Sequence, residues 1–256
     1  MEMKTLSAAR RDLSARRAVR TLLGSGGVAL IAALALGLLI APADRVQGEW
    51  QRLMYVHVPA AWSAYLCFAI VLGASALYLW RRGAGAARVG RAAAEAGVAL
   101  TALTLASGSA WGAATWGTWW VWDGRTTSTV AMALVYVVYL AARAIEVGRV
   151  SRLVAAGIGV VGFAVVPVVH LSVLWWRTLH QPATLLAPST SPPIHPLMGA
   201  AILAAVLAVT IITLLLVRWR AQALASPPVE KPAERNPVLG ASGPAGRIVT
   251  RRDARP

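Results

Sequence analysis

Two histidines stand out because each has tryptophan and arginine close by in the sequence. His57 lies in RLMYVHVPAAW, residues 52–62, and His180 lies in SVLWWRTLHQPAT, residues 172–184. Neutral imidazole nitrogen is the commonest metal ligand among side chains. A lone histidine in a loop is usually only a solvated polar group, so metal ligation by this pair needs support from a second feature.

The second feature is the segment WGAATWGTWWVWDGRTTS, residues 111–128. One loop does not need so many tryptophans as membrane-interface anchors. On a short helix, positions i, i+3, i+4 and i+7 share one face, and these positions are Trp116, Trp119, Trp120 and Asp123. A strand would instead divide the rings between two sides. The segment, which also contains Trp122, therefore predicts a short helix that presents a flat aromatic shelf.

A ligand suited to two imidazoles, an aromatic shelf and nearby cations is flat, apolar, metal-centred and anionic at one edge. Haem meets all four conditions. Imidazole binds haem iron axially, and indole rings pack against the macrocycle. The planar guanidinium group matches a propionate carboxylate, and the available arginines are Arg52, Arg125 and Arg177.

The elements that must position these residues are membrane helices. The chain has 256 residues, of which 57% are hydrophobic and 14% are charged, and its mean hydropathy is +0.61. A soluble globule could not bury that much apolar surface. The net charge of +15 could suggest nucleic-acid binding, but the basic residues form short runs between apolar segments and do not gather on one folded face. We therefore expect a lipid bilayer and no nucleic acid as the partner.

Apolar runs of about the length that crosses hydrocarbon, roughly 17 to 25 residues, predict an all-α integral membrane protein with six transmembrane helices. They lie near residues 22–41, 59–80, 93–111, 127–142, 153–171 and 197–217. The third is rich in Thr, Ser and Gly, which suits a helix packed against other helices more than one facing lipid. Pro59 suits the first turn of the second helix and places His57 just ahead of it.

Lysine and arginine are concentrated in the N-terminal tail, around residues 81–91, around residues 143–152 and in the C-terminal tail. By the positive-inside rule, these parts and both termini are cytoplasmic. The other loops carry only Arg45, Arg52, Arg125 and Arg177. His57, the tryptophan-rich segment and His180 are therefore predicted to face outward, away from the cytoplasm, with the short tryptophan-rich helix at the membrane interface.

The predicted domains are a basic cytoplasmic tail (1–21), a six-helix membrane domain (22–220) and a disordered cytoplasmic tail (221–256), the last rich in Pro, Gly, Ala and charge. A small-residue motif, Ala41-Pro42-Ala43, follows the first apolar run and imitates a signal-peptide cleavage site. The run of about 18 residues is longer than the usual 7 to 15 of a signal peptide, so we expect the first helix to be retained.

The segments MYVHVPAAW, WGTWWVWDGRTTS and SVLWWRTLHQ, in that order between six spans, resemble the tryptophan-rich haem-handling family of bacterial cytochrome c maturation. The resemblance implies a haem-delivery protein of the inner membrane that is not an enzyme. It also implies that His57 and His180 are axial ligands of a transiently held b-type haem. The segment from Trp116 to Asp123 would be the surface where this haem meets a periplasmic haem chaperone. Further implied partners are the subunits of an ATP-binding-cassette transporter and a small single-span subunit.

Two other functions stay open at this point. An electron-transfer subunit with b-type haem would place paired histidines inside the spans, whereas only His170 lies within a predicted span. A plain permease subunit would need no histidines at the membrane rim. His195, in SPPIHPL, is predicted to lie in a loop. The absorption spectrum of the purified protein separates these possibilities.

The predicted topology can be tested by cysteine labelling in intact cells. Cysteines that replace Thr118 and Ser189 should react with a membrane-impermeant thiol reagent, because the basic residues place both positions in the periplasm. A cysteine at Ser151 should be protected. The opposite labelling pattern at the three positions would reverse the predicted orientation.

Overall fold

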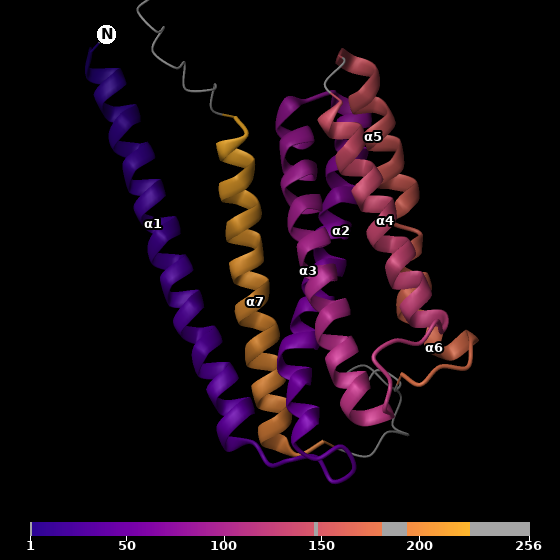
Figure 1. Ribbon diagram of the computed structural model, residues 1–256. Helices are drawn as coiled ribbons and strands as arrows, with labels where there is room; N and C mark the ends of the chain where they lie inside the picture. The colour runs from indigo at the N-terminus through magenta and orange to yellow at the C-terminus, as the bar shows by residue number, and fades with distance from the viewer. Residues whose placement is uncertain (1, 146–147, 181–193, 226–256) are drawn as a thin grey trace, which may run out of the picture. The chain divides into compact units, whose positions relative to one another are not determined.

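The structure, a computed structural model, describes residues 2–145, 148–180 and 194–225. Within these ranges, six helical spans are long and apolar enough to cross a membrane. The helices are α1 (Glu2–Ala35), α2 (Met54–Arg81), α3 (Ala84–Trp116), α4 (Gly124–Ala144), α5 (Gly148–Gly162), α6 (Val165–Trp175) and α7 (Pro196–Ala223) (Figure 1). Helices α5 and α6 together form the fifth span. The predicted all-α membrane fold with six spans is confirmed.

Several helices are longer than the predicted spans. Helix α3 runs over Ala84–Trp116 where residues 93–111 were expected, and α1 begins at Glu2, inside the stretch predicted as a tail. An apolar run marks only the part of a helix that suits hydrocarbon, and the helix itself can continue into the polar interface. Residues 226–256, most of the predicted disordered tail, lie outside the described residues.

The fifth span is broken between α5 and α6, and Pro167 explains the break. Proline has no backbone N–H, and its ring clashes with the carbonyl group four residues earlier, here that of Phe163. The helix accordingly stops at Gly162, and Phe163 and Ala164 form a turn. Helix α6 then restarts at Val165 and leads the chain toward His180.

Close contacts between α2, α3 and α4 form the core that carries the site. A Cβ atom at Gly97 of α3 would lie 2.5 Å from Cε1 of Phe68 in α2, so glycine allows the two helices to approach. Phe68 also stacks on Tyr136 of α4, with ring centroids 3.6 Å apart. Glu95 of α3 accepts hydrogen bonds from Arg91 and, at 2.6 Å, from Arg220 of α7.

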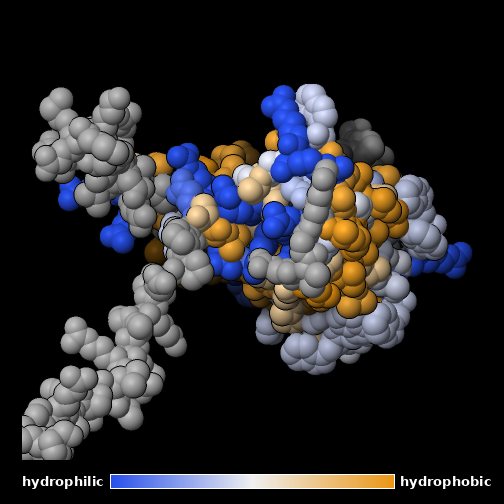
Figure 2. All heavy atoms as spheres, turned by 90° about the horizontal axis from the view of Figure 1, so that it is seen from above, coloured by the Kyte–Doolittle hydropathy of each residue, from blue (hydrophilic) through white to orange (hydrophobic). Residues whose placement is uncertain are grey.

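The two ends of the bundle differ in character. Figure 2 looks onto the upper end of the bundle of Figure 1 and shows hydrophilic residues gathered there, with hydrophobic residues along the sides. Here α2 passes into α3 through Arg81 and Arg82, both exposed. At the opposite end, α1 leads into α2, α3 leads into α4, and α6 ends (Figure 1). We refer to this opposite end as the tryptophan end.

The prediction of a short helix for the tryptophan-rich segment is wrong. Trp116 is the last residue of α3, Gly117 ends that helix with a left-handed φ of 73°, and Asp123 is the N-cap of α4. Glycine adopts this backbone conformation without steric cost and commonly ends helices. Residues 117–123 therefore form a non-helical connection, called here the tryptophan loop, and the tryptophans do not share one helix face.

Candidate functional site

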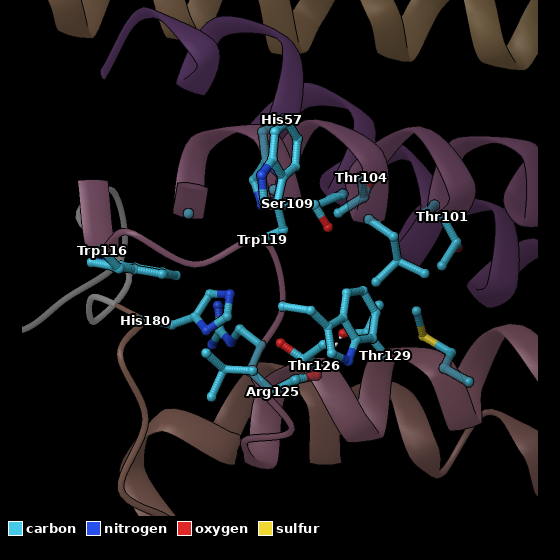
Figure 3. Close-up of a pocket in the computed structure, with 18 of the residues that line it drawn as sticks. His57, Thr101, Thr104, Ser109, Trp116, Trp119, Arg125, Thr126, Thr129 and His180 are labelled. Atoms are coloured by element: carbon cyan, nitrogen blue, oxygen red, sulfur yellow. Dashed lines mark hydrogen bonds between the residues drawn. The ribbon is translucent and has the colours of Figure 1, made fainter. Parts of the chain in front are cut away.

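A hollow opens at the tryptophan end between α2, α3, α4 and the tryptophan loop. It includes about 750 Å³ of space free of protein atoms, counting the part open to solvent. Its lining includes His57, Tyr65, Thr101, Thr104, Gly108, Trp116, Trp119, Trp120, Arg125, Thr129, Met132 and His180. Figure 3 shows that His57 and His180 approach the same space from different elements. The structure thus brings the two predicted ligands together.

His180 is held by a carboxylate. Its Nδ1 atom lies 3.0 Å from Oδ2 of Asp123, and its ring meets Trp116 edge-on at a centroid distance of 5.1 Å. The hydroxyl group of Thr178 donates to the same Oδ2 atom and accepts the backbone N–H of His180 at 3.1 Å. Asp123 also accepts the backbone N–H of Thr126 at 2.8 Å through Oδ1, as an N-cap does. One side chain thus joins the start of α4 to the imidazole of His180.

Burial and hydrogen bonds shift the pKa values of Asp123 and His180 and so determine their charges. Burial alone would raise the pKa of Asp123, but hydrogen bonds from Thr126, Thr178 and His180 outweigh it and lower that pKa to about 2. Burial lowers the pKa of His180, and the carboxylate of Asp123 opposes this effect only in part. The carboxyl group is therefore ionised and the imidazole neutral at pH 7, and neutral imidazole is the form that binds metals.

His57 lies inside α2, not ahead of it as predicted. A 3₁₀-helix, η2 (Glu49–Leu53), leads directly into α2 at Met54, so Pro59 follows the first helical turn instead of opening it. The Nδ1 atom of His57 lies 3.2 Å from Oγ of Ser107 on α3. The helix register, fixed by η2, aims the imidazole across the gap between α2 and α3.

Two further residues, Gly108 and Trp111, contact the imidazole ring of His57 and determine the space around it. A Cβ atom at Gly108 would lie 2.9 Å from Cε1 of the imidazole, so a larger residue there would displace the ring. On another side, Trp111 meets the ring edge-on at 5.8 Å and donates its indole N–H to Oε1 of Gln47 at 2.8 Å. The residues that surround the imidazole of His57 therefore come from α3 and from the connection between α1 and α2.

Among the described arginines, Arg125 is the one that lines the hollow. Its Nη2 group donates to the backbone carbonyl of His170 at 2.9 Å. Its Nε atom is buried and has no hydrogen-bond partner among the described residues. A buried, unpaired donor carries a desolvation cost that an anionic group in the hollow would remove.

Other predicted site residues lie away from the lining. Arg52 pairs with Glu49 and donates to the carbonyl of Gly37 in the π-helix η1 (Leu36–Ile40), so its charge serves the connection between α1 and α2. Trp122 is 70% exposed and packs edge-on against Trp120 at 5.3 Å.

The remaining histidines and Arg177 have other surroundings. His170 lies in α6, meets Tyr65 edge-on at 6.3 Å and accepts Arg125 through its carbonyl group. His195 is the N-cap of α7, where its Nδ1 atom accepts the backbone N–H of Leu197. Arg177 is exposed.

The residues of the hollow fit haem better than a bare metal ion. Among the described residues, no three His, Cys, Asp or Glu side chains gather as a metal cage. Two imidazoles suffice for haem, since the macrocycle itself supplies the other iron ligands. Indole rings suit the macrocycle faces, and the unpaired Nε of Arg125 suits a propionate.

Three residues that contact the two histidines, Ser107, Gly108 and Thr178, were not predicted from the sequence. Two of them belonged to a visible pattern, because Thr101, Thr104 and Ser107 recur every third residue on α3 and face the other helices together with Gly108. That polar stripe could have been identified as one wall of a site. No sequence signal pairs Thr178 with Asp123, because their contact depends on how α6 ends.

The sequence matches the family model described as Heme exporter protein C over residues 3–230. The chain belongs to this family. It is 37% identical over 162 residues to Heme exporter protein C of Bradyrhizobium diazoefficiens, a match that covers 62% of each chain. The corresponding protein of Escherichia coli strain K12 is 34% identical over 158 residues, or 61% of this chain and 64% of that one.

A plant relative gives a similar match. The cytochrome c biosynthesis ccmC-like mitochondrial protein of Marchantia polymorpha is 34% identical over 159 residues, which cover 62% of this chain and 68% of the relative. The matches thus span between 62% and 68% of the length of these three relatives. Membership of this family agrees with the resemblance seen in the tryptophan-rich segment and the two histidine segments.

Proposed function

We propose that this protein binds haem without a covalent bond and presents it at the periplasmic face of the bacterial inner membrane. A periplasmic haem chaperone would receive the haem there for the biogenesis of c-type cytochromes. The observation that carries the proposal is the convergence of His57 and His180 on one hollow, with both Nδ1 atoms engaged by protein groups. Engagement of Nδ1 leaves Nε2 of each ring for iron.

Each part of the hollow has a role in this proposal. Bound haem would supply an iron centre that accepts the two Nε2 atoms as axial ligands. The indole rings of Trp116, Trp119 and Trp120 would cover apolar faces of the macrocycle. The guanidinium group of Arg125 would bind a propionate and so fix which edge of the ligand faces α4. Asp123 would orient the imidazole of His180.

The openness of the site supports delivery over storage. The roughly 750 Å³ of the hollow includes space that is open to solvent, so part of a bound macrocycle would stay accessible. Trp119, which lines the hollow, is 69% exposed and can be covered by a second protein. Each additional 1.4 kcal/mol or so of binding free energy makes a ligand about tenfold harder to release. A carrier that hands its ligand onward therefore benefits from an incomplete enclosure.

The proposed role is that of a carrier subunit and not of an enzyme. The family is named for haem export, and we propose that this chain works beside the subunits of an ATP-binding-cassette transporter and a small single-span subunit. An electron-transfer role has less support, because His170 of α6 packs against Tyr65 and does not line the hollow.

Replacement of the ligands tests the haem site. His57→Ala and His180→Ala should each abolish or shift the Soret band of haem bound to the purified protein, because each removes one axial nitrogen. His195→Ala is the matched control, since this histidine caps α7 and does not line the hollow. An unchanged spectrum in both ligand variants would contradict the proposed function.

Replacement of Arg125 tests the propionate contact. Arg125→Ala should lower haem retention during purification while the spectrum of the remaining haem still shows two axial imidazoles, because the iron ligands are untouched. Arg177→Ala, which changes an exposed arginine away from the lining, serves as the control. Wild-type haem content in Arg125→Ala would refute the propionate assignment.

Transfer to the chaperone tests the tryptophan loop. Replacement of Trp119 and Trp120 together by alanine should reduce complex formation with the haem chaperone and reduce covalent haem on it. Haem that stays bound should keep its ligated spectrum. The control replaces Trp80 and Trp219, which are also exposed but lie at the other end of α2 and α7. Normal loading of the chaperone by the Trp119 and Trp120 variant would leave these rings as membrane-interface anchors only.

A further inference from the structure

The two imidazoles of the hollow are held by acceptors of different charge. His180 faces the ionised carboxylate of Asp123, whose side chain is only 6% exposed, with Nδ1 3.0 Å from Oδ2. His57 faces the neutral hydroxyl group of Ser107 at 3.2 Å. Contacts behind a ligating imidazole fix its tautomer and tune its strength as a ligand.

We infer that Asp123 and Ser107 are positioning residues that turn both Nε2 atoms toward the hollow and make His180 the stronger of the two iron ligands. This inference rests on the proposed function, because it assigns unequal roles to the two ligands of that site. It also makes His57 the ligand that exchanges first when another group approaches the iron.

The tautomer of His180 follows from its partner. An ionised carboxylate can only accept hydrogen bonds, so Nδ1 must carry the proton in the contact with Oδ2 of Asp123. The hydroxyl group of Thr178 donates to the same oxygen atom, so its proton is not available to Nδ1. Nε2 of His180 is therefore unprotonated and has a lone pair for a metal.

The tautomer of His57 follows from the partners of Ser107. Oγ of Ser107 lies 2.7 Å from the carbonyl oxygen of Leu103, the distance of a well-formed O–H···O hydrogen bond. The single hydroxyl proton is therefore donated to that carbonyl, and the oxygen can only accept from Nδ1 of His57. Gly108 leaves room for this orientation, since a Cβ atom there would contact the ring at 2.9 Å.

The two acceptors differ in how strongly they polarise the rings. A hydrogen bond to an ionised acceptor is roughly twice as strong as one between neutral groups. Nδ1–H of His180 donates to a full negative charge, which raises the electron density at Nε2 and its basicity. Among the described residues, His57 has only uncharged acceptors, which are the hydroxyl oxygen of Ser107 at a longer distance and the backbone carbonyl of Thr104. The iron would therefore be held more firmly from the side of His180.

Asp123→Asn tests the stronger half of the pair in the full-length purified protein with added haemin. Asparagine caps a helix as well as aspartate does, and its oxygen can keep the bond to the backbone of Thr126. Its NH₂ group would then face His180 as a donor, which moves the imidazole proton to Nε2 and removes that nitrogen as a ligand. We expect loss of the six-coordinate spectrum, recovery on addition of free imidazole, and an affinity for haemin at least about tenfold lower.

The matched control for that variant is Asp44→Asn. Asp44 accepts two backbone N–H groups through Oδ1, at 2.9 Å and 2.8 Å, and none of its hydrogen bonds reaches an imidazole among the described residues. The same substitution there should leave both the spectrum and the affinity unchanged. If Asp123→Asn had the same haem spectrum and the same affinity for haemin as Asp44→Asn, the positioning role assigned to Asp123 would be wrong.

Ser107→Ala tests the weaker half and does not depend on how well Asp123→Asn folds. Ser128→Ala is a close control, because Ser128 also donates to the carbonyl groups three and four residues earlier, but none of its hydrogen bonds reaches an imidazole among the described residues. Ser107→Ala should lower the affinity for haemin more than Ser128→Ala does and less than Asp123→Asn does. It should also speed the replacement of one axial ligand of ferrous haem by carbon monoxide.

The outcomes separate this inference from the proposed function. Haemin that gives no ligated spectrum with the wild-type protein would refute the function itself. If the wild-type protein gives a ligated spectrum but Ser107→Ala and Ser128→Ala have the same affinity for haemin, only the role of Ser107 is refuted. An effect of Ser107→Ala on affinity that equals or exceeds that of Asp123→Asn would refute the unequal strength of the two ligands.

Discussion

The structure depends on one constraint: the hydrocarbon of a membrane offers no hydrogen-bond partners, so polar groups in the spans must be satisfied by the protein. Hydroxyl groups on α3 meet it by donating to their own helix, as Thr101 does to Gly97 and Thr104 does to Leu100. These side chains therefore offer only acceptor oxygens to the hollow. Arg125, at the start of α4, brings a positive charge to the lining, where a ligand carboxylate can be paired. The lining of the hollow thus combines uncharged hydroxyl oxygens from α3 with the positive charge of Arg125 from α4.

The sequence was sufficient to predict the spans, because length and hydropathy alone determine which segments can cross a membrane. It was also sufficient to single out His57, His180 and the tryptophan-rich segment, since the basic residues predict all three at the same side of the membrane. Their convergence is a consequence of antiparallel helices whose ends meet at one face. The family match agrees with this interpretation of the chain.

Local conformation and side-chain partners were harder to predict. The spacing of Trp116, Trp119 and Trp120 suits a helix, yet the cap residues Gly117 and Asp123 end one helix and begin the next, and caps outweighed periodicity there. Arg52 was predicted at the site but lies away from the lining, because its partners, Glu49 and Gly37, belong to the irregular turns between α1 and α2. Pairs such as His57 with Ser107 join distant parts of the chain, and a single sequence does not encode them in any short pattern.

The way the imidazoles are fixed bears on how a delivery site can work repeatedly. Ser107, Asp123 and Thr178 hold the two rings through hydrogen bonds made entirely by the protein, so the orientation of the rings does not have to be created by the ligand. Preorganised groups lower the entropic cost of binding, which allows adequate affinity without deep enclosure. A deeply enclosing pocket would gain affinity by burying the macrocycle and would hide it from a second protein. Under the proposed function, preorganised imidazoles at an open rim would bind haem and leave one face of it accessible, and both properties are needed when a ligand is to be passed on.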